Sequence, residues 1–177
     1  SDRSGEGNLD IWVQQVASGE PIRLTRHAAD DHYPAFSPDG ARIAFRSERD
    51  GGGIYTIPAL GGSERLMARN GDGPRFSPDG KSIAYSVGTG LRAAKILIVP
   101  AEGGPPRELD TGLPWAAAPI WSADGAHLLF SGSTEPAGFN PLRSDWYVVP
   151  AGGGKAVATG AFAVLREQRL LGPSGGN

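Results

Sequence analysis

The sequence predicts an all-β protein in which four-stranded antiparallel sheets follow one another along the chain. Two repeating patterns carry this prediction. The motif Phe-Ser-Pro-Asp-Gly at residues 36–40 returns at 76–80 and, as Trp-Ser-Ala-Asp-Gly, at 121–125. An apolar run that ends in Pro-Ala and precedes paired glycines occurs at residues 54–62, 96–104 and 146–154. A repeat of about 40 to 45 residues matches one blade of a β-propeller, so we expect a β-propeller segment.

The chain begins with a hairpin that has the pattern of the outer half of a blade. Residues 8–16 alternate between the two faces of a strand, which is typical of a half-buried β-strand. The sequence Ser-Gly-Glu-Pro at 18–21 predicts a turn, and residues 22–25 return as a second strand. We therefore assign residues 1–31 to the outer hairpin of an incomplete blade.

Each complete blade is predicted to contain two hairpins. In the first, residues 33–37 and 42–47 pair across the Pro-Asp-Gly turn, where proline presets the first turn position and glycine accepts a positive φ. In the second, the apolar run ends in a proline at the strand end, and the paired glycines reverse the chain. Asp39, Asp79 and Asp124 are expected to accept backbone amides within the first turn of each blade, which is a structural role.

This assignment gives three complete blades, at residues 32–68, 69–110 and 111–159, within one propeller domain. Residues 160–177 are expected to supply a closing strand and a flexible tail. We hypothesise that residues 161–171 complete the N-terminal hairpin, in the same chain or in a neighbouring copy, because an open arc would leave sheet faces and edges bare. A homo-oligomer that completes the open propeller is one form of this hypothesis.

The composition argues against several classes of partner. The 177 residues carry a net charge of -2, so there is no basic surface to attract nucleic acid. No stretch is apolar enough for insertion into a membrane. The chain has no cysteine, which removes disulfides and thiolate metal sites. The chain does not start with methionine, and its first residues have the pattern of the middle of a repeat, so we expect it to be part of something longer.

The sequence predicts no enzyme activity, no cofactor and no metal site. The motif Gly-x-Ser-x-Gly occurs at residues 172–176, but a nucleophile elbow needs a strand before it and a helix after it, and the chain ends at Asn177. His27, His32 and His127 do not have the spacing of a known metal-ligand motif.

A polar cluster on one rim of the propeller is the first candidate site. The cluster is predicted in the loops that join the fourth strand of one blade to the first strand of the next. It consists of Asp30, Asp31 and His32, with Asn70, Asp72 and Trp115 in the equivalent loops. Its oxygen atoms could hold Ca²⁺ or Mg²⁺ or receive a cationic group of a ligand. The alternative is that these residues only make turns and cap backbone amides.

Two arginines extend the candidate site. Arg49 is predicted in a loop on the same rim, where arginine and aromatic side chains often anchor a protein partner. Arg75 takes the place that Ala35 and Ile120 hold in the other blades, on a strand whose alternate side chains face the central channel. It is expected either to pair with Asp72 or Asp31 or to present its charge to a ligand in the channel.

The residues of the first complete blade resemble a known family of repeats. The run Phe-Ser-Pro-Asp-Gly-x-x-Ile-Ala-Phe at 36–45, with Ser-Glu-Arg-Asp-Gly at 47–51 and Ile-Tyr-x-Ile-Pro at 54–58, resembles the TolB-type, WD-like β-propeller repeat of bacteria. The resemblance covers roughly residues 1–159. It departs at Ala123, which replaces the proline of the turn, and in the long loop 134–144.

The resemblance implies a scaffold that binds proteins or envelope components. Such propellers occur alone in the periplasm, as sensor-like C-terminal regions of bacterial serine/threonine kinases, behind winged-helix regulators, and as gates of prolyl-oligopeptidase-like serine peptidases. A periplasmic or other extracytoplasmic location is therefore implied.

Three hypotheses of function follow. The first is a non-catalytic interaction module that binds a protein or a small ligand at the channel rim. The second is an accessory role, as the gating propeller of a serine peptidase or as a TolB-like envelope protein. The third is a metal-dependent hydrolase that uses Asp30, Asp31, His32 and Asp72.

Overall fold

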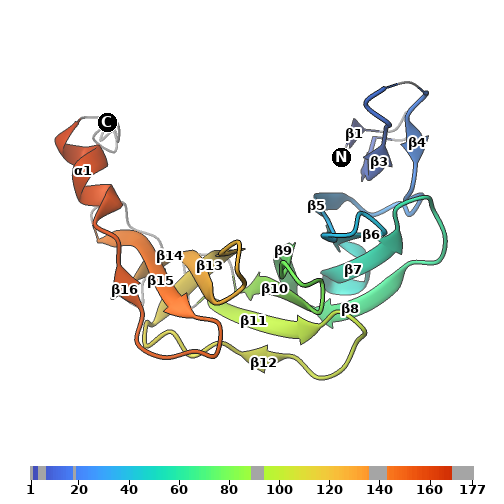
Figure 1. The fold of residues 1–177 in the computed structure, drawn as a ribbon. Coiled ribbons are helices and arrows are strands. Elements are labelled where there is room, and N and C mark those ends of the chain that lie inside the picture. Colours follow the sequence, from blue (N-terminus) through green and yellow to red (C-terminus); the bar gives the residue numbers. More distant parts are fainter. Residues whose placement is uncertain (1, 4–6, 18, 89–93, 136–142, 169–177) are drawn as a thin grey trace.

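The structure, a computed structural model, describes residues 2–3, 7–17, 19–88, 94–135 and 143–168. Successive antiparallel sheets follow one another along an open arc, with the N-terminal strands at one end and a helix at the other (Figure 1). Three of these sheets have four strands in chain order. The predicted fold class, a β-propeller segment of four-stranded blades with an N-terminal hairpin, is confirmed.

The strands fall into an N-terminal group and three blades. The N-terminal group contains the pair β1 (Asp2–Arg3) and β2 (Leu9–Asp10) and the pair β3 (Trp12–Val13) and β4 (Ile22–Arg23). Blade 1 consists of β5 (Asp31–Phe36), β6 (Arg42–Ser47), β7 (Gly53–Pro58) and β8 (Arg65–Arg69). Blade 2 consists of β9 (Gly71–Phe76), β10 (Ser82–Val87), β11 (Lys95–Pro100) and β12 (Arg107–Glu108). Blade 3 consists of β13 (Trp115–Trp121), β14 (His127–Ser133), β15 (Ser144–Pro150) and β16 (Val157–Ala158).

The Pro-Asp-Gly turns are built as the sequence predicts. In blade 1, the Ser37 hydroxyl donates a hydrogen bond of 2.6 Å to Asp39, which also accepts one of 3.0 Å from the backbone N–H of Ala41. Gly40 closes the turn with a φ of 69°. The aspartates of the other two turns, Asp79 and Asp124, accept the same pair of hydrogen bonds. The structural role expected for the three aspartates is confirmed.

We expect acid to remove the stability that these turns confer. Hydrogen bonds from serine hydroxyls, and then from backbone N–H groups, hold the pKa of Asp39, Asp79 and Asp124 below the ordinary value of 3.8. The unfolded chain therefore binds protons first as the pH falls. The contribution is complete above about pH 5 and declines as the pH drops through the lower pKa values of the folded protein. Urea unfolding from about pH 5 to about pH 2.5 measures this decline.

A triple variant separates these aspartates from the other carboxylates. Asparagine at positions 39, 79 and 124 still accepts hydrogen bonds through its side-chain oxygen but cannot ionise. The triple variant should therefore lose less stability than the parent over the same pH range. If the free energy of unfolding falls equally with pH in the triple variant and the parent, the prediction is wrong.

The hydrophobic core is divided among the interfaces between neighbouring sheets. One cluster joins the N-terminal group to blade 1 and includes Ile11, Leu24 and Phe45. A second joins blades 1 and 2, and a third joins blades 2 and 3. The central strands β6 and β10 contribute side chains to the clusters on both of their faces, which explains their nearly continuous apolar runs. The central strand β14 contributes Leu128 and Phe130 to the cluster between blades 2 and 3.

The prediction of a closing strand after residue 160 is wrong. Residues 161–167 form the helix α1 (Ala161–Glu167), and Figure 1 places it at the opposite end of the arc from β3 and β4. The segment contains alanine, leucine and glutamate and no glycine or proline, which favours a helix. Asp145 fixes its start by accepting hydrogen bonds from the backbone N–H groups of Gly160 and Phe162, and Phe162 is buried. Residues 169–171 lie outside the described residues.

The helix α1 has seven residues. Nowhere in the described part of the chain is a helix both long enough and apolar enough to cross a lipid bilayer.

Candidate binding site on the channel wall

The three innermost strands, β5, β9 and β13, line the concave side of the arc (Figure 1). Each of them is interrupted by a β-bulge at the same point of the repeat, directly before a proline. The residues in the bulges are Tyr33, Gly73 and Ala118, with φ values of 53°, 58° and 56°. Positive φ strains a residue other than glycine, and such strain often marks a functional site.

Because of these bulges, the innermost strands begin earlier than predicted. Asp31, His32, Asp72 and Trp115 were expected in loops but lie within β5, β9 and β13. The extra residue in the bulge breaks the alternation of side chains on which the sequence prediction depends. The ladder nevertheless resumes beyond it, for example where Asp72 pairs with Ser86.

A pocket of about 260 Å³ lies where the three innermost strands meet. Blade 2 supplies Asp72, Gly73, Arg75 and Ser86. Blade 1 supplies the half-exposed ring of Tyr33, and blade 3 supplies the residues 117–120 of β13. The pocket therefore combines two opposite charges with an apolar wall.

Asp72 carries the negative charge of the pocket. Its Oδ1 atom is buried and has no hydrogen-bond partner among the described residues. Hydrogen bonds to Glu48 are the main cause that raises the pKa of the nearby Arg46, and the charge of Asp72 adds to this effect. A buried carboxylate oxygen without a donor is uncommon in folded proteins, where such atoms usually bind a protein group, water or an ion.

Arg75 carries the positive charge. Its side chain is exposed, and one Nη donates a hydrogen bond of 2.8 Å to the carbonyl of its neighbour Pro74. A guanidinium group has five N–H donors, so most of them remain available. The expected pairing with Asp72 or Asp31 is not formed among the described residues.

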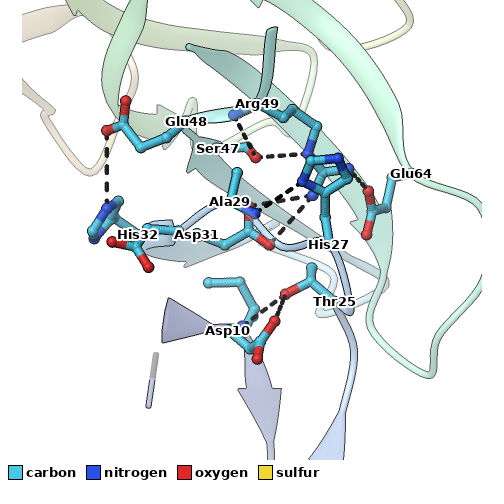
Figure 2. A network of polar contacts seen from close by, with 12 residues as sticks. Asp10, Thr25, His27, Ala29, Asp31, His32, Ser47, Glu48, Arg49 and Glu64 are labelled. Atoms are coloured by element: carbon cyan, nitrogen blue, oxygen red, sulfur yellow. Dashed lines mark hydrogen bonds and ion pairs between the residues drawn. The ribbon is translucent and has the colours of Figure 1, made fainter. Parts of the chain in front are cut away.

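Asp31 and Arg49 belong to a buried structural network instead (Figure 2). The Asp31 side chain is fully buried, and both of its oxygens lie 3.3 Å from an Nη of Arg49. Arg49 also pairs with Glu64, donates to the Ser47 hydroxyl, and lies 4.7 Å above the Tyr55 ring. This burial speaks against the expectation that the two side chains form part of a binding surface.

Asp30 and His32 are also engaged with the protein. Asp30 accepts a hydrogen bond of 2.7 Å from the backbone N–H of Leu9 and so holds β2 against blade 1. His32 lies 3.9 Å from Glu48 (Figure 2). Glu48 also forms a bidentate ion pair with Arg46. These contacts fit the alternative that the residues stabilise the rim.

Trp115 lies at the start of β13 and is 5% exposed. It packs with Ala94 and Ala117 in a small apolar cluster. The indole therefore supports blade 3 from within, and little of it is open to a partner.

Three parts of the pocket were not predicted from the sequence as site residues. These are Tyr33, Ser86 and the residues 117–120. A signal for Tyr33 was present, because it is an aromatic residue before a proline at the repeat position that Gly73 and Ala118 occupy. Ser86 gave no such signal, since its role is to accept a hydrogen bond of 2.9 Å from the Ala118 N–H of the next blade.

Across the ranges that the structure describes, no three side chains of histidine, aspartate or glutamate gather closely enough to hold a metal ion. The Gly-x-Ser-x-Gly motif at 172–176 lies outside the described residues.

Comparison of the sequence with known proteins finds partial matches. No protein-family model matches the chain. The chain is 33% identical over 86 residues to the uncharacterized peptidase YuxL of Bacillus subtilis. The match covers 46% of this chain and 13% of that protein. The chain is also 27% identical over 110 residues to the tricorn protease homolog 1 of Streptomyces coelicolor. This match covers 58% of this chain and 10% of that protein. The chain thus spans only a small part of these relatives.

Comparison of the structure finds propellers. A TolB protein from Agrobacterium tumefaciens superposes with a TM-score of 0.74 at 23% identity over 89% of this chain and 58% of the other. TolB from Acinetobacter baumannii superposes with a TM-score of 0.69 at 22% identity, over 84% of this chain and 37% of the other. The acylaminoacyl peptidase of Pyrococcus horikoshii superposes with a TM-score of 0.53 at 18% identity, over 73% of this chain and 24% of the other. At such identities the likeness shows the fold alone.

Proposed function

Because the chain has the fold of a TolB-type β-propeller, we propose that it is a non-catalytic recognition module. It binds a protein segment or a small ligand in the pocket between β5, β9 and β13. The observation that supports this most strongly is the presence of Asp72 and Arg75 in that pocket. Neither charge is neutralised by the other, and Asp72 has a buried oxygen without a donor among the described residues.

The internal repeat indicates that the fold does not need these two charges. The register of the innermost strands places Arg75 where blade 1 has Ala35 and blade 3 has Ile120. The same register places Asp72 where the other blades have His32 and Ala117. Neutral or differently charged residues therefore build the same strand, so a role in recognition accounts better for the pair in blade 2.

The chemistry of the pocket favours binding over catalysis. Of the described residues that line it, Ser86 has the only aliphatic hydroxyl, and no histidine lies beside it as a base. The Ser86 hydroxyl accepts a hydrogen bond from the Ala118 N–H, which gives it a structural role between blades 2 and 3. A nucleophilic serine requires a base within hydrogen-bond reach.

A second candidate function is the propeller part of a larger peptidase. Two observations favour it: the sequence relatives YuxL and tricorn protease homolog 1 are named as peptidases, and a peptidase is among the structural neighbours. The pocket would then contact substrates on their way to a separate hydrolase domain. A hydrolase domain in the full-length reading frame would support this role. The kinase-sensor and winged-helix hypotheses gain no support from the comparisons.

Binding in the pocket can be tested by NMR with blocked peptides. We expect an equimolar library of N-acetylated, C-amidated hexapeptides to shift the backbone signals of Gly73 and Ala118 in the isotope-labelled 177-residue chain. Arg75→Ala, which copies Ala35, should weaken this binding on the order of tenfold, because a hydrogen bond to a charged group contributes about 1.5–3 kcal/mol.

The matched control is Arg69→Ala. It removes the same charge from an exposed position on the outer strand β8 and should leave the peptide-induced shifts unchanged. If Arg69→Ala weakens the binding as much as Arg75→Ala does, the peptides respond to net charge and the pocket is not their site.

A further inference from the structure

The bulge in β9 brings Asp72 and Arg75 to the same side of the blade. In an unbroken strand, residues three apart point to opposite faces. Here Asp72 pairs with Ser86 and Arg75 pairs with Ala84, and these partners are two residues apart on β10. The two charged side chains therefore share one face, which is the face that β13 approaches.

The two charges are separate recognition points within one small pocket. They do not form an ion pair with each other, although both line it. A ligand with only a negative charge would meet the repulsion of Asp72, and one with only a positive charge would meet that of Arg75. A molecule that carries both charges satisfies both groups, because each charge gains a charge-assisted hydrogen bond.

The size and walls of the pocket limit the rest of the ligand. Its volume of about 260 Å³ is smaller than that of pockets that hold drug-sized molecules, which have about 300–1,000 Å³. The residues Tyr33 and Ile120 are 56% and 45% exposed, which leaves apolar surface for a short side chain of the ligand. The aromatic face of Tyr33 also suits an ammonium group.

We infer that this pocket binds a small zwitterion of the size of an α-amino acid. The carboxylate of the ligand pairs with Arg75, its ammonium group pairs with Asp72, and its apolar side chain contacts Tyr33 and Ile120. This inference rests on the proposed function, because it names the ligand class of the same pocket.

The test compares leucine with its singly blocked forms. NMR titration of the labelled chain at pH 7 uses leucine, N-acetyl-leucine, which lacks the ammonium group, and leucine amide, which lacks the carboxylate. We expect leucine to shift the signals of Gly73 and Ala118. Each blocked form should bind on the order of tenfold more weakly, because it loses one charge-assisted pair.

Two variants assign each end of the ligand to its residue. In Arg75→Ala the advantage of leucine over leucine amide should disappear, whereas its advantage over N-acetyl-leucine remains. Asp72→Ala introduces the residue that blade 3 has at this position, Ala117. In this variant the advantage of leucine over N-acetyl-leucine should disappear, whereas its advantage over leucine amide remains. Arg69→Ala should behave as the parent. Since the other blades carry these neutral residues at the same positions, both pocket variants are expected to fold.

The outcomes separate this inference from the proposed function. If leucine and its blocked forms bind equally, or none of them binds while the blocked hexapeptides do, the zwitterion inference is overturned and the recognition pocket stands. If neither leucine nor the hexapeptides shift the signals of Gly73 and Ala118, both are overturned. Binding of leucine with the reciprocal pattern in the two variants supports both.

Discussion

Replacing Arg49 with alanine is expected to lower the free energy of unfolding by about 3–5 kcal/mol. The Asp31 side chain is fully buried, and Arg49 is the residue that neutralises it (Figure 2). Without the guanidinium, Asp31 would remain as a charge in the interior of blade 1, which is costly because the low-dielectric surroundings solvate it poorly. Urea unfolding of the variant and the parent at pH 7 measures the difference.

A second substitution tests whether the buried charge is the cause. The register position of Asp31 is occupied by Gly71 in blade 2 and by Ala116 in blade 3, so alanine fits this strand. The double variant Arg49→Ala with Asp31→Ala should therefore recover more than half of the lost stability. The remaining loss reflects the contact of Arg49 with the Tyr55 ring, which contributes about 0.5–2 kcal/mol. If the double variant is no more stable than Arg49→Ala, the explanation by an unpaired Asp31 is wrong.

The repeat made most of the fold readable from the sequence. The Pro-Asp-Gly turn and the paired glycines determine where each hairpin reverses, so the central strands were predicted within a few residues. The starts of β5, β9 and β13 were not, because the residue with positive φ interrupts the alternation before each proline. The tail was misassigned because a closing strand was inferred from the bare faces and edges of an open arc, whereas the residues after 160 themselves favour the helix α1.

The candidate site was predicted in part. Asp72 and Arg75 line the pocket, and Arg75 was recognisable because it replaces small or apolar residues of the other blades. The sequence could not show that Asp31 and Arg49 are buried together, because their partner Glu64 comes from a distant part of the blade and its approach depends on how the loop after β6 folds. Loop residues with the same charges can face a ligand or each other, and only the tertiary contacts decide between these cases.

The second large effect concerns the interface between blades 2 and 3. Phe130 on β14 is fully buried among residues of both blades and stacks on Tyr147 at 6.0 Å between ring centroids. Phe130→Ala should lower the stability by about 3–5 kcal/mol, as is usual when a buried ring is deleted. Because the buried clusters of the described residues join each blade to its neighbours, we expect hydrogen exchange to accelerate first in β13–β16, while β5–β8 stay protected.

Phe45→Ala is the matched variant at the other end of the arc. Phe45 holds the same repeat position on β6, is equally buried, and stacks on Tyr55 at 6.0 Å, but its cluster joins blade 1 to the N-terminal group. Its removal should accelerate exchange in residues 9–24 and spare blade 3. Because the two substitutions delete the same ring from equivalent sites, a difference in where exchange rises must come from which interface was opened. Uniform acceleration in both variants would mean that the arc unfolds as one cooperative unit, and the division of the core into separate interfaces would then have no energetic consequence.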